Sequence, residues 1–506
     1  MLRIGYDARQ LYNNFTGPGN YSRTLLSNLA EYYPDNAYFL YTPRLTRNEE
    51  TQFFLNSALY NTHMPRRKGF PLLWQNFGIK RDLKRQRIQL FHGLNQSLPF
   101  GLSKTGIKSV ITVHDLIFKR FPKQYTFSRR LALDFRLKYA CREADHIVAI
   151  SENTRQDLLH FYEVPPEKVS VIYQSCHERY MQERSNKTLE AVRQRYQLPK
   201  EYILSVGAII PRKNLSGAIK ALSIMPASER IPLVVVGRGA RHKQQILRLA
   251  KQLQLSDHIH FADVRFNDLP AVYQSASLFV YPSLYEGFGI PILEALFSKV
   301  PVLTSDTASL PEAGGPGAHL TDPTQPEAIA EGIRKVLTDT EYQARLIHDG
   351  FEHAQQFLGE PLSEKMIDLY EELIGKEYLT PEQITSSLHP NIALWEWNGD
   401  TIFPESVVNL KTHITLDILD SDELVRPEVE LKVEGRVSKI HKTHKRCRVA
   451  DDFRIAPRDI QQQLLDKLRI RSVGHTHLNV KAGLIVVVAP VDKMLNDQAG
   501  VGDNHN

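Results

Sequence analysis

The sequence predicts an α/β fold in which two doubly wound parallel-sheet domains face a cleft and a small β-rich appendage follows them. Three observations support this prediction. Short apolar runs alternate with helical patterns over residues 1–375. A polar stretch at 175–187 separates these runs into two sets, and the pattern changes after Gly375. Apolar strands that alternate with helices indicate parallel sheets covered on both faces, so each set predicts one domain.

The first set of apolar runs predicts six strands of an N-terminal domain over residues 1–175. The runs are rich in β-branched, aliphatic and aromatic residues, as is typical of buried strands. Helical patterns fill the gaps between them, for example at 21–31 and 129–143. The predicted strands occupy residues 2–7, 37–41, 90–95, 110–115, 146–151 and 169–173.

The second set predicts a C-terminal domain of the same kind over residues 187–375. A helical pattern at 214–224 follows its first strand. Because two such domains meet at the carboxyl ends of their strands, the cleft between them is the expected ligand site. The predicted strands occupy residues 202–207, 233–237, 258–263, 278–283 and 300–305.

Residues 376–495 are expected to form an α+β extension, to which the sequence assigns no role. Residues 496–506 predict a disordered tail, because they are polar and rich in Asn, Asp and Gly. The strand-like and helical segments of the extension occupy residues 391–397, 410–416, 428–437, 457–469 and 483–490.

The bulk properties fit a cytoplasmic protein of several domains. A chain of 506 residues is too long for one core, so two or three domains are expected. No run approaches the ~18 uninterrupted apolar residues of a membrane span. Arg3 and Asp7 make the N-terminus a first core strand rather than a signal peptide. Three scattered cysteines form no disulfide framework, which favours a reducing compartment.

The most informative stretch is 281–296, where Glu286 and Glu294 stand eight positions apart with two glycines and a proline between them. A buried strand is predicted just before it. Pro291 suits the first position of a helix, which places Glu294 in the first helical turn. Glycine lets the backbone approach a ligand, and a helix start offers unpaired N–H groups. The stretch therefore predicts a polar cup for the hydroxyl groups of a sugar nucleotide.

Two adjacent cations, Arg212 and Lys213, occupy the loop between a strand that ends at Gly207 and a helix that starts near Asn214. A leaving nucleoside diphosphate gains negative charge as its bond to a sugar breaks. Positioned cations stabilise that charge more in the transition state than in the ground state. Because the loop lies at the ligand-facing end of a predicted parallel sheet, we expect it to bind such a group.

Polar residues also follow strands of the first domain. Gly17 and Gly19 lie in a turn between the first strand and a helix, where backbone N–H groups can meet a phosphate or a sugar. His114 ends the strand at 110–115, and it is either structural or part of the site. His92 and Asn95 follow the neighbouring strand, and we expect them to meet an acceptor.

The 281–296 stretch and the Arg212-Lys213-Asn214 run together resemble the signature of the retaining glycosyltransferases of family 4, which have the GT-B fold of two Rossmann-like domains. The resemblance covers about residues 1–375. It implies that Arg212 and Lys213 bind the diphosphate of the donor and that Glu286 lies at the donor sugar. It also implies that Glu294 accepts hydrogen bonds from the ribose hydroxyls.

The resemblance extends to further positions. It implies that the backbone N–H groups around Phe288 and Gly289 meet the sugar or the diphosphate, and that His114 contacts the donor sugar from the acceptor-side domain. The glycine-rich loop of the family departs from its usual pattern here, because Pro18 interrupts it. The remaining donor-side positions are glycines: Gly17, Gly19 and Gly207.

The resemblance implies a retaining glycosyltransferase that moves a hexose from a nucleotide-sugar donor to a hydroxyl of a glycan or lipid-linked acceptor, and related sequences favour mannose as that hexose. The expected setting is the assembly of cell-surface polysaccharide or lipopolysaccharide. No metal is expected, because the cationic loop already supplies the charge that a metal would bring. No other cofactor and no nucleic acid are expected either. Two alternatives stay open, a GT-B epimerase and a non-catalytic sugar- or anion-binding protein.

Two basic segments add further expectations. Residues 118–142 hold eight basic residues, one acid and six aromatics. Such a helix either lies on the anionic inner face of the plasma membrane or is a solvated face whose aromatics enter the core. The tail holds His441, His444 and Cys447 among lysines. Their spacing matches no zinc pattern, so we expect a basic surface there and no metal.

Overall fold

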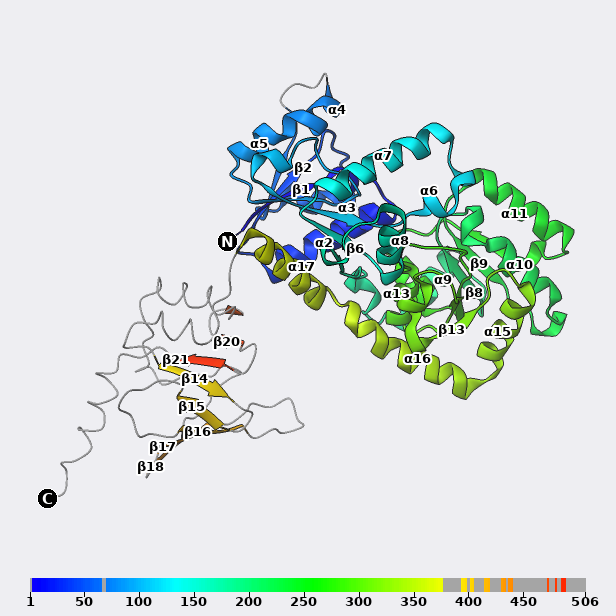
Figure 1. Cartoon of the computed structure of the whole chain (residues 1–506). Helices are drawn as coiled ribbons and strands as arrows, with labels where there is room; N and C mark the ends of the chain where they lie inside the picture. Colours follow the sequence, from blue (N-terminus) through cyan, green and yellow to red (C-terminus); the bar gives the residue numbers. More distant parts are fainter. Residues whose placement is uncertain are drawn as a thin grey trace. The chain divides into compact units, whose positions relative to one another are not determined.

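The structure, a computed structural model, describes residues 2–65 and 70–375 and eight strands between 393 and 487. Two compact units make up the chain, residues 1–375 and 376–506. Figure 1 shows two sheets in the first unit, each with helices packed around it. This confirms the predicted α/β fold with two doubly wound domains.

The first sheet has seven parallel strands in the order β3-β2-β1-β4-β5-β6-β7. The order changes direction between β1 and β4, and ligands of α/β proteins bind at the carboxyl ends of strands beside such a point. The strands are β1 (Arg3–Asp7), β2 (Ala37–Tyr41), β3 (Tyr60–His63), β4 (Leu90–Gly93), β5 (Lys108–Val113), β6 (His146–Ala149) and β7 (Val169–Val171).

The second sheet has six parallel strands in the order β10-β9-β8-β11-β12-β13. Its order changes direction between β8 and β11, so the loops that leave these two strands face its ligand-binding edge. The strands are β8 (Ile203–Val206), β9 (Leu233–Val236), β10 (Ile259–Ala262), β11 (Leu278–Tyr281), β12 (Val302–Ser305) and β13 (Ala318–Thr321).

Helices surround both sheets. Those of the first domain are α1 (Arg9–Asn13), α2 (Gly17–Tyr32), α3 (Glu49–Asn56), α4 (Pro71–Leu73), the π-helix η1 (Trp74–Gly78), α5 (Ile79–Arg85), α6 (Ile117–Arg120), α7 (Phe127–Glu143) and α8 (Glu152–Tyr162). Those that follow are α9 (Asn186–Arg195), α10 (Leu215–Ile224), α11 (Ala240–Gln252), α12 (Leu269–Gln274), α13 (Ile290–Phe297), α14 (Leu310–Gly314), α15 (Pro326–Thr338), α16 (Thr340–Ala354) and α17 (Gly359–Ile374).

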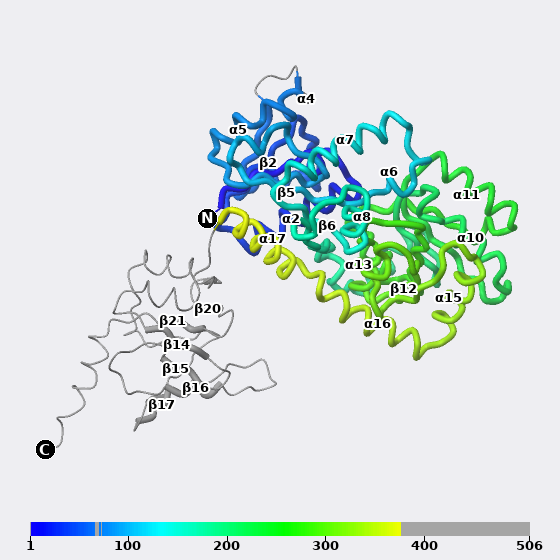
Figure 2. Tube along the Cα trace, in the orientation of Figure 1, coloured from blue at the N-terminus to red at the C-terminus, as the bar shows by residue number. Residues whose placement is uncertain are grey.

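The last of these helices, α17, follows the second domain in sequence but packs against α2 of the first. In Figure 2 the yellow α17 lies close to the blue N-terminal part of the chain. The Tyr370 hydroxyl of α17 lies 2.5 Å from Nδ1 of His92 in β4. The helix therefore completes the core of the first domain.

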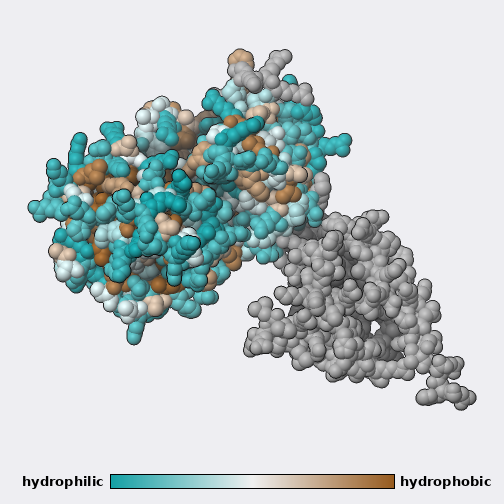
Figure 3. Space-filling view, turned by 180° about the vertical axis from the view of Figure 1, so that it is seen from behind, coloured by the Kyte–Doolittle hydropathy of each residue, from teal (hydrophilic) through white to brown (hydrophobic). Residues whose placement is uncertain are grey.

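Both sheets bury both faces, as parallel sheets do. Successive residues of one strand pack in different hydrophobic cores. In β4, Leu90 lies in a first core and Phe91 in a second. In β8, Leu204 lies in that same first core and Ile203 in a third. One apolar core therefore runs from the first sheet to the second. On the face drawn in Figure 3, hydrophilic residues predominate over both domains. No helix in the described part of the chain has the length and apolar content needed to cross a membrane.

In the second unit, six strands form an antiparallel sheet in the order β18-β17-β16-β15-β14-β21, and β19 pairs with β20. The helix expected at 457–469, the tail at 496–506 and the basic segment with His441, His444 and Cys447 lie outside the described residues. The strands are β14 (Ala393–Trp397), β15 (Thr401–Pro404), β16 (Ile414–Ile418), β17 (Val429–Val433), β18 (Arg436–Lys439), β19 (Arg471–Ser472), β20 (Leu478–Asn479) and β21 (Leu484–Val487).

Candidate functional site

Two cations occupy the loop that leaves β8. The loop forms a short 3₁₀ turn at Pro211–Lys213, and proline presets the backbone angle at its start. Asn214 then adopts the left-handed conformation with φ of 55° and leads into α10. The Asn214 side-chain amide donates a hydrogen bond of 2.7 Å to the Pro323 carbonyl, which anchors the loop. Arg212 and Lys213 are thus held at the ligand-facing edge of the second sheet.

Glu286, in the loop that leaves β11, pairs with both of these cations. Its carboxylate lies 2.7 Å from an Arg212 guanidinium nitrogen and 2.8 Å from Lys213 Nζ, and the three side chains are at most 18% exposed. Burial opposes ionisation of Glu286, but the Lys213 and Arg212 charges outweigh it and hold the pKa of its carboxyl below the ordinary value. We refer to Arg212, Lys213 and Glu286 as the charged triad.

Tyr281, the last residue of β11, extends the charged triad. Lys213 donates a hydrogen bond to the Tyr281 hydroxyl, and its Nζ lies 4.5 Å from the ring centre. Arg212 donates to the backbone carbonyl of Tyr285. The sequence analysis gave Tyr281 no role. Its position at the end of a buried strand, opposite the cationic loop, is the signal that indicates one.

The Glu286 loop is held by side chains around it. The Ser309 hydroxyl lies 2.9 Å from the Glu286 carbonyl oxygen and 2.8 Å from that of Phe288. A Cβ atom at Gly287 would lie 1.9 Å from the carbonyl oxygen of His114, so the loop touches the first domain at a point where only glycine fits. This contact brings the charged triad next to the end of β5.

His114 lies on the first-domain side of that contact and is buried. Its Nε2 is 2.9 Å from the Leu94 carbonyl oxygen, and its Nδ1 is 3.2 Å from the Gln174 side-chain nitrogen. A ring that donates through one nitrogen and accepts through the other is neutral. Burial lowers the pKa of His114 to about 4, so the imidazole stays neutral near pH 7. The structure thus places a neutral His114 beside the Glu286 loop.

Two long-range contacts fix the domains around this point. The Glu312 carboxylate of α14 accepts hydrogen bonds of 2.7 and 2.8 Å from the backbone N–H groups of Glu152 and Asn153, so it caps the start of α8 in the other domain. Tyr285 donates to the carboxylate of Asp157. The sequence carries no local sign of these contacts, because the partners stand 128–160 positions apart.

Glu294 lies outside the charged triad and outside the first turn of its helix. α13 begins at Ile290 with Pro291 in its second position, so the predicted placement of Glu294 in the first turn is wrong. The Tyr273 hydroxyl donates to the Glu294 carboxylate at 2.7 Å. Burial raises the pKa of this carboxyl to about 7. Of the four charged residues predicted for the site, the three of the charged triad are therefore in direct contact. The fourth, Glu294, is hydrogen-bonded to Tyr273 instead.

Gly17 and Gly19 lie in the first turn of α2, and not in a loop before it, because α2 begins at Gly17. The Gly19 N–H already donates to the Thr16 carbonyl at 2.9 Å. A Cβ atom at Gly19 would lie 1.7 Å from the Asn14 carbonyl oxygen, which explains this glycine by close packing. Gly17 has the more open position at the helix start.

The other donor-side positions lie near the charged triad. Gly207 follows β8 and Gly289 precedes α13, with φ angles of 144° and 146°. Phe288 is buried, and its ring centre lies 5.4 Å from those of Tyr173 and Phe357. The Phe288 side chain is thus part of the core, and only its backbone is available to a ligand.

His92 is not available to an acceptor. It is fully buried, and its Nδ1 and Nε2 lie 2.5 Å from the Tyr370 hydroxyl and 2.8 Å from the Thr112 hydroxyl. Burial lowers its pKa to about 3. The expectation that His92 meets an acceptor is therefore wrong, and the residue is part of the core. Asn95 is partly exposed in the loop after β4 and remains accessible.

The charged triad is suited to binding a group with more than one negative charge. Such a group can replace Glu286 as the partner of Arg212 and Lys213, since both cations already lie together at the edge of the sheet. No group of three or more His, Cys, Asp or Glu side chains arranged to hold a metal ion occurs in residues 2–65 and 70–375.

Two family models match the chain, one in each half of the first unit. The model of glycosyl transferases group 1 matches residues 188–353, which include the charged triad. The model of glycosyltransferase family 4 matches residues 16–175, which include His114.

Curated relatives carry related names. The O-antigen chain mannosyltransferase B of Escherichia coli is 30% identical over 285 residues, which cover 56% of this chain and 74% of that protein. The serotype-specific mannosyltransferase WbdA of Escherichia coli is 32% identical over 268 residues, which cover 51% of this chain but only 33% of WbdA.

Solved structures share the fold. The structure of Anabaena HepE in complex with UDP and glucose aligns over its whole length with 74% of this chain, at a TM-score of 0.59 and 17% identity. This likeness confirms the predicted two-domain fold.

Proposed function

Since the chain belongs to the group 1 glycosyltransferases, we propose that it is a retaining enzyme that transfers a hexose, mannose in the first place, from a nucleotide-sugar donor to a hydroxyl of a glycan or lipid-linked acceptor. Family membership makes the chain a glycosyltransferase. The donor, the stereochemical course, the acceptor and a setting in cell-surface polysaccharide assembly are the proposal.

The charged triad carries this proposal. Arg212 and Lys213 converge on one carboxylate at 2.7 and 2.8 Å, at the edge of the second sheet and beside His114 of the first. A diphosphate bears the charge and the several oxygen acceptors that two adjacent cations bind best. The Glu286 carboxylate pairs with both cations, so a diphosphate that binds them competes with it.

In the proposed reaction, the bond between the anomeric carbon and the diphosphate oxygen breaks, and the acceptor oxygen bonds to that carbon on the same face. The acceptor proton passes to the leaving phosphate oxygen. Arg212 and Lys213 stabilise the charge that develops on the diphosphate. Glu286, released from the two cations, accepts a hydrogen bond from a hydroxyl of the donor sugar, and Glu294 accepts from the ribose.

The preference for mannose and for polysaccharide assembly rests on the names of relatives, which include the O-antigen chain mannosyltransferase B and WbdA of Escherichia coli. The expectation of a nucleotide donor is supported by HepE, whose structure contains UDP and glucose.

A thermal-shift screen of GDP-mannose, UDP-glucose and other nucleotide sugars tests the donor, since a bound ligand stabilises the native state by mass action. The true donor raises the melting temperature and releases its nucleoside diphosphate when an acceptor is added. Arg212→Gln should lower the rate of release by about 10²–10³, as loss of one stabilising donor does. The exposed Arg248→Gln on α11 is the matched control. Donor isomerisation without acceptor would indicate an epimerase, and a thermal shift without release of nucleoside diphosphate would indicate a non-catalytic binding protein. The absence of a shift with every nucleotide sugar would contradict the proposed donor class.

We further propose that α7 contacts an anionic membrane. This helix buries only Leu137, Ala140 and Cys141. Its Phe127 and Phe135 are 72% and 61% exposed, which favours the membrane expectation over aromatics in the core. Binding to phosphatidylglycerol vesicles in a flotation assay should fall with salt and with Phe127→Ser, but not with Leu247→Ser on α11. Failure to float at low salt would refute this part of the proposal.

A further inference from the structure

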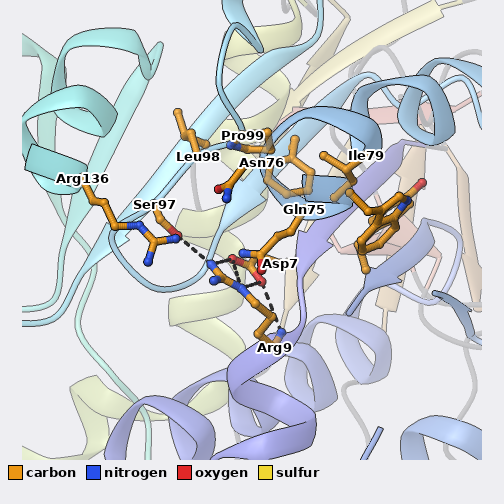
Figure 4. A pocket seen from close by; sticks show the side chains of 12 residues that line it. Asp7, Arg9, Gln75, Asn76, Ile79, Ser97, Leu98, Pro99 and Arg136 are labelled. Atoms are coloured by element: carbon orange, nitrogen blue, oxygen red, sulfur yellow. Dashed lines mark hydrogen bonds and ion pairs between the residues drawn. The ribbon is translucent and has the colours of Figure 1, made fainter. Parts of the chain in front are cut away.

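A second polar pocket lies in the first domain, outside the charged triad. Figure 4 shows Asp7 of its lining at the end of the strand β1 and Arg9 after it, with Arg136 reaching in from α7 and Gln75 and Asn76 from η1. The loop after β4 contributes Ser97, Leu98 and Pro99. The sequence analysis assigned none of these residues to a site.

The charges in this pocket are unequal. Arg9 is paired with Asp7, through hydrogen bonds of 2.8 and 3.0 Å from Nε, and it also donates to the Ser97 hydroxyl at 2.8 Å. Asp7 therefore neutralises Arg9, and Arg136 brings a second positive charge. In the described part of the chain, Arg136 makes no hydrogen bond or ion pair. Partial burial and the Arg9 charge lower the pKa of its guanidinium.

An uncharged group in the same pocket also lacks a partner. The Gln75 side chain is buried there, and its amide, which lies beside Arg9 in Figure 4, makes no hydrogen bond among the described residues. Buried polar groups are normally hydrogen-bonded, so an unpartnered amide next to two arginines indicates a missing ligand with oxygen acceptors.

The pocket is one loop away from the reaction centre. The segment from Leu94 to Ser97 connects the two, because the Leu94 carbonyl bonds His114 while Ser97 bonds Arg9. The Gln96 side chain donates to the carbonyl of Asp115 at 2.9 Å, which ties the segment to the end of β5. A ligand in the pocket thus lies on the first-domain side of His114, whereas the cations suited to the donor diphosphate lie in the second domain.

We propose that this pocket binds an anionic oxygen group, a phosphate or a carboxylate, that is carried by the acceptor. The anion lies between Arg136 and Arg9 and accepts hydrogen bonds from the side-chain amides of Gln75 and Asn76. Its identification as part of the acceptor rests on the proposed function, whereas the binding itself does not. The charged group then holds the acceptor so that a hydroxyl can reach the donor sugar at His114.

Calorimetry on the full chain, without any nucleotide sugar, tests this binding with three probes. Farnesyl diphosphate represents a lipid phosphate, glucose 6-phosphate a sugar phosphate, and methyl glucuronoside an acidic sugar. Farnesol, glucose and methyl glucoside are their uncharged counterparts. At least one probe should bind about tenfold or more tightly than its counterpart, since a charge-assisted pair contributes that much. The probe that binds identifies the source of the anion.

Arg136→Gln should weaken the binding of that probe about tenfold, and the matched Arg130→Gln, on the same helix but outside the pocket, should leave it unchanged. UDP or GDP at saturating concentration should not displace the probe. Equal weakening by both variants, displacement by the nucleotide, or no selectivity over the uncharged counterparts would overturn the inference. A chain that keeps probe binding but transfers no sugar would instead contradict the proposed function.

Discussion

Replacement of Glu286 by glutamine tests the charged triad most directly. The change removes the only negative charge of the triad and leaves Arg212 and Lys213 buried beside each other. Loss of one partner from a buried ion pair costs roughly 3–5 kcal/mol. The glutamine oxygen can still accept one hydrogen bond, which recovers about 1 kcal/mol. We therefore expect a loss of about 3 kcal/mol in the free energy of unfolding.

Urea denaturation at pH 7 measures this loss, with Glu183→Gln as the control. Glu183 forms an ion pair with Lys299 at 3.0 Å, but its side chain is 82% exposed, so its loss should cost less than about 1 kcal/mol. The pKa of Glu286 is lowered in the folded state. Its stabilising effect is therefore present above the unfolded pKa of about 4.3 and is lost as the pH falls through the folded value.

The shift in melting temperature on binding of a nucleoside diphosphate provides a second test. It should raise the melting temperature of Glu286→Gln at least as much as that of the wild type, because the variant offers two cations without a competing carboxylate. Equal stability of Glu286→Gln and Glu183→Gln at pH 7 would refute the reasoning about the triad. A variant that is destabilised but gains nothing from the diphosphate would refute the reasoning about its ligand.

Three further predictions follow from buried groups. The pKa of Glu294 is raised to about 7 in the folded state. The free energy of unfolding of the wild type should therefore fall as the pH rises from the unfolded pKa of about 4.3 through 7. Glu294→Gln should remove this fall, as measured by urea denaturation at pH 5 and pH 8. Because the pKa of His114 is about 4, its NMR ring signals should not titrate above pH 5.5; a midpoint near 6.5 would contradict the buried neutral ring. Tyr370→Phe removes the hydroxyl that lies 2.5 Å from His92 and should cost about 1–3 kcal/mol in urea denaturation, more than Tyr342→Phe at the half-buried His319.

The sequence indicates every central strand of both sheets and the edge strands β7 and β10, but neither β3 nor β13. Central parallel strands are buried on both faces, so their apolar runs are continuous. β3 and β13 are edge strands, and they contain polar residues such as Asn61 and His319. These two edge strands therefore resemble loops in the sequence, whereas the edge strands β7 and β10 lie in runs with enough apolar residues to be recognised.

Local patterns also indicate which loops carry charge, but not how the charges pair. The loop with Arg212 and Lys213 and the loop with Glu286 are separately visible in the sequence, whereas their ion pairs depend on the order of β8 and β11 in the sheet. The same limit explains His92, whose partner Tyr370 lies on a helix 278 positions away. It also explains the pocket of Arg9 and Arg136, which joins three distant segments.

The return of α17 to the first domain has a consequence for the chain as it leaves the ribosome. His92 emerges early, but Tyr370 follows 278 residues later, which is roughly 14–56 s at synthesis rates of ~5–20 residues per second. During that interval the face of α2 that α17 will cover stays open, while the whole second domain is being made. Of the two parallel-sheet domains, the N-terminal one is thus the first to be synthesised but the last to be completed. A nascent chain released before Gly359 exposes the uncovered face of α2 to chaperones or proteases.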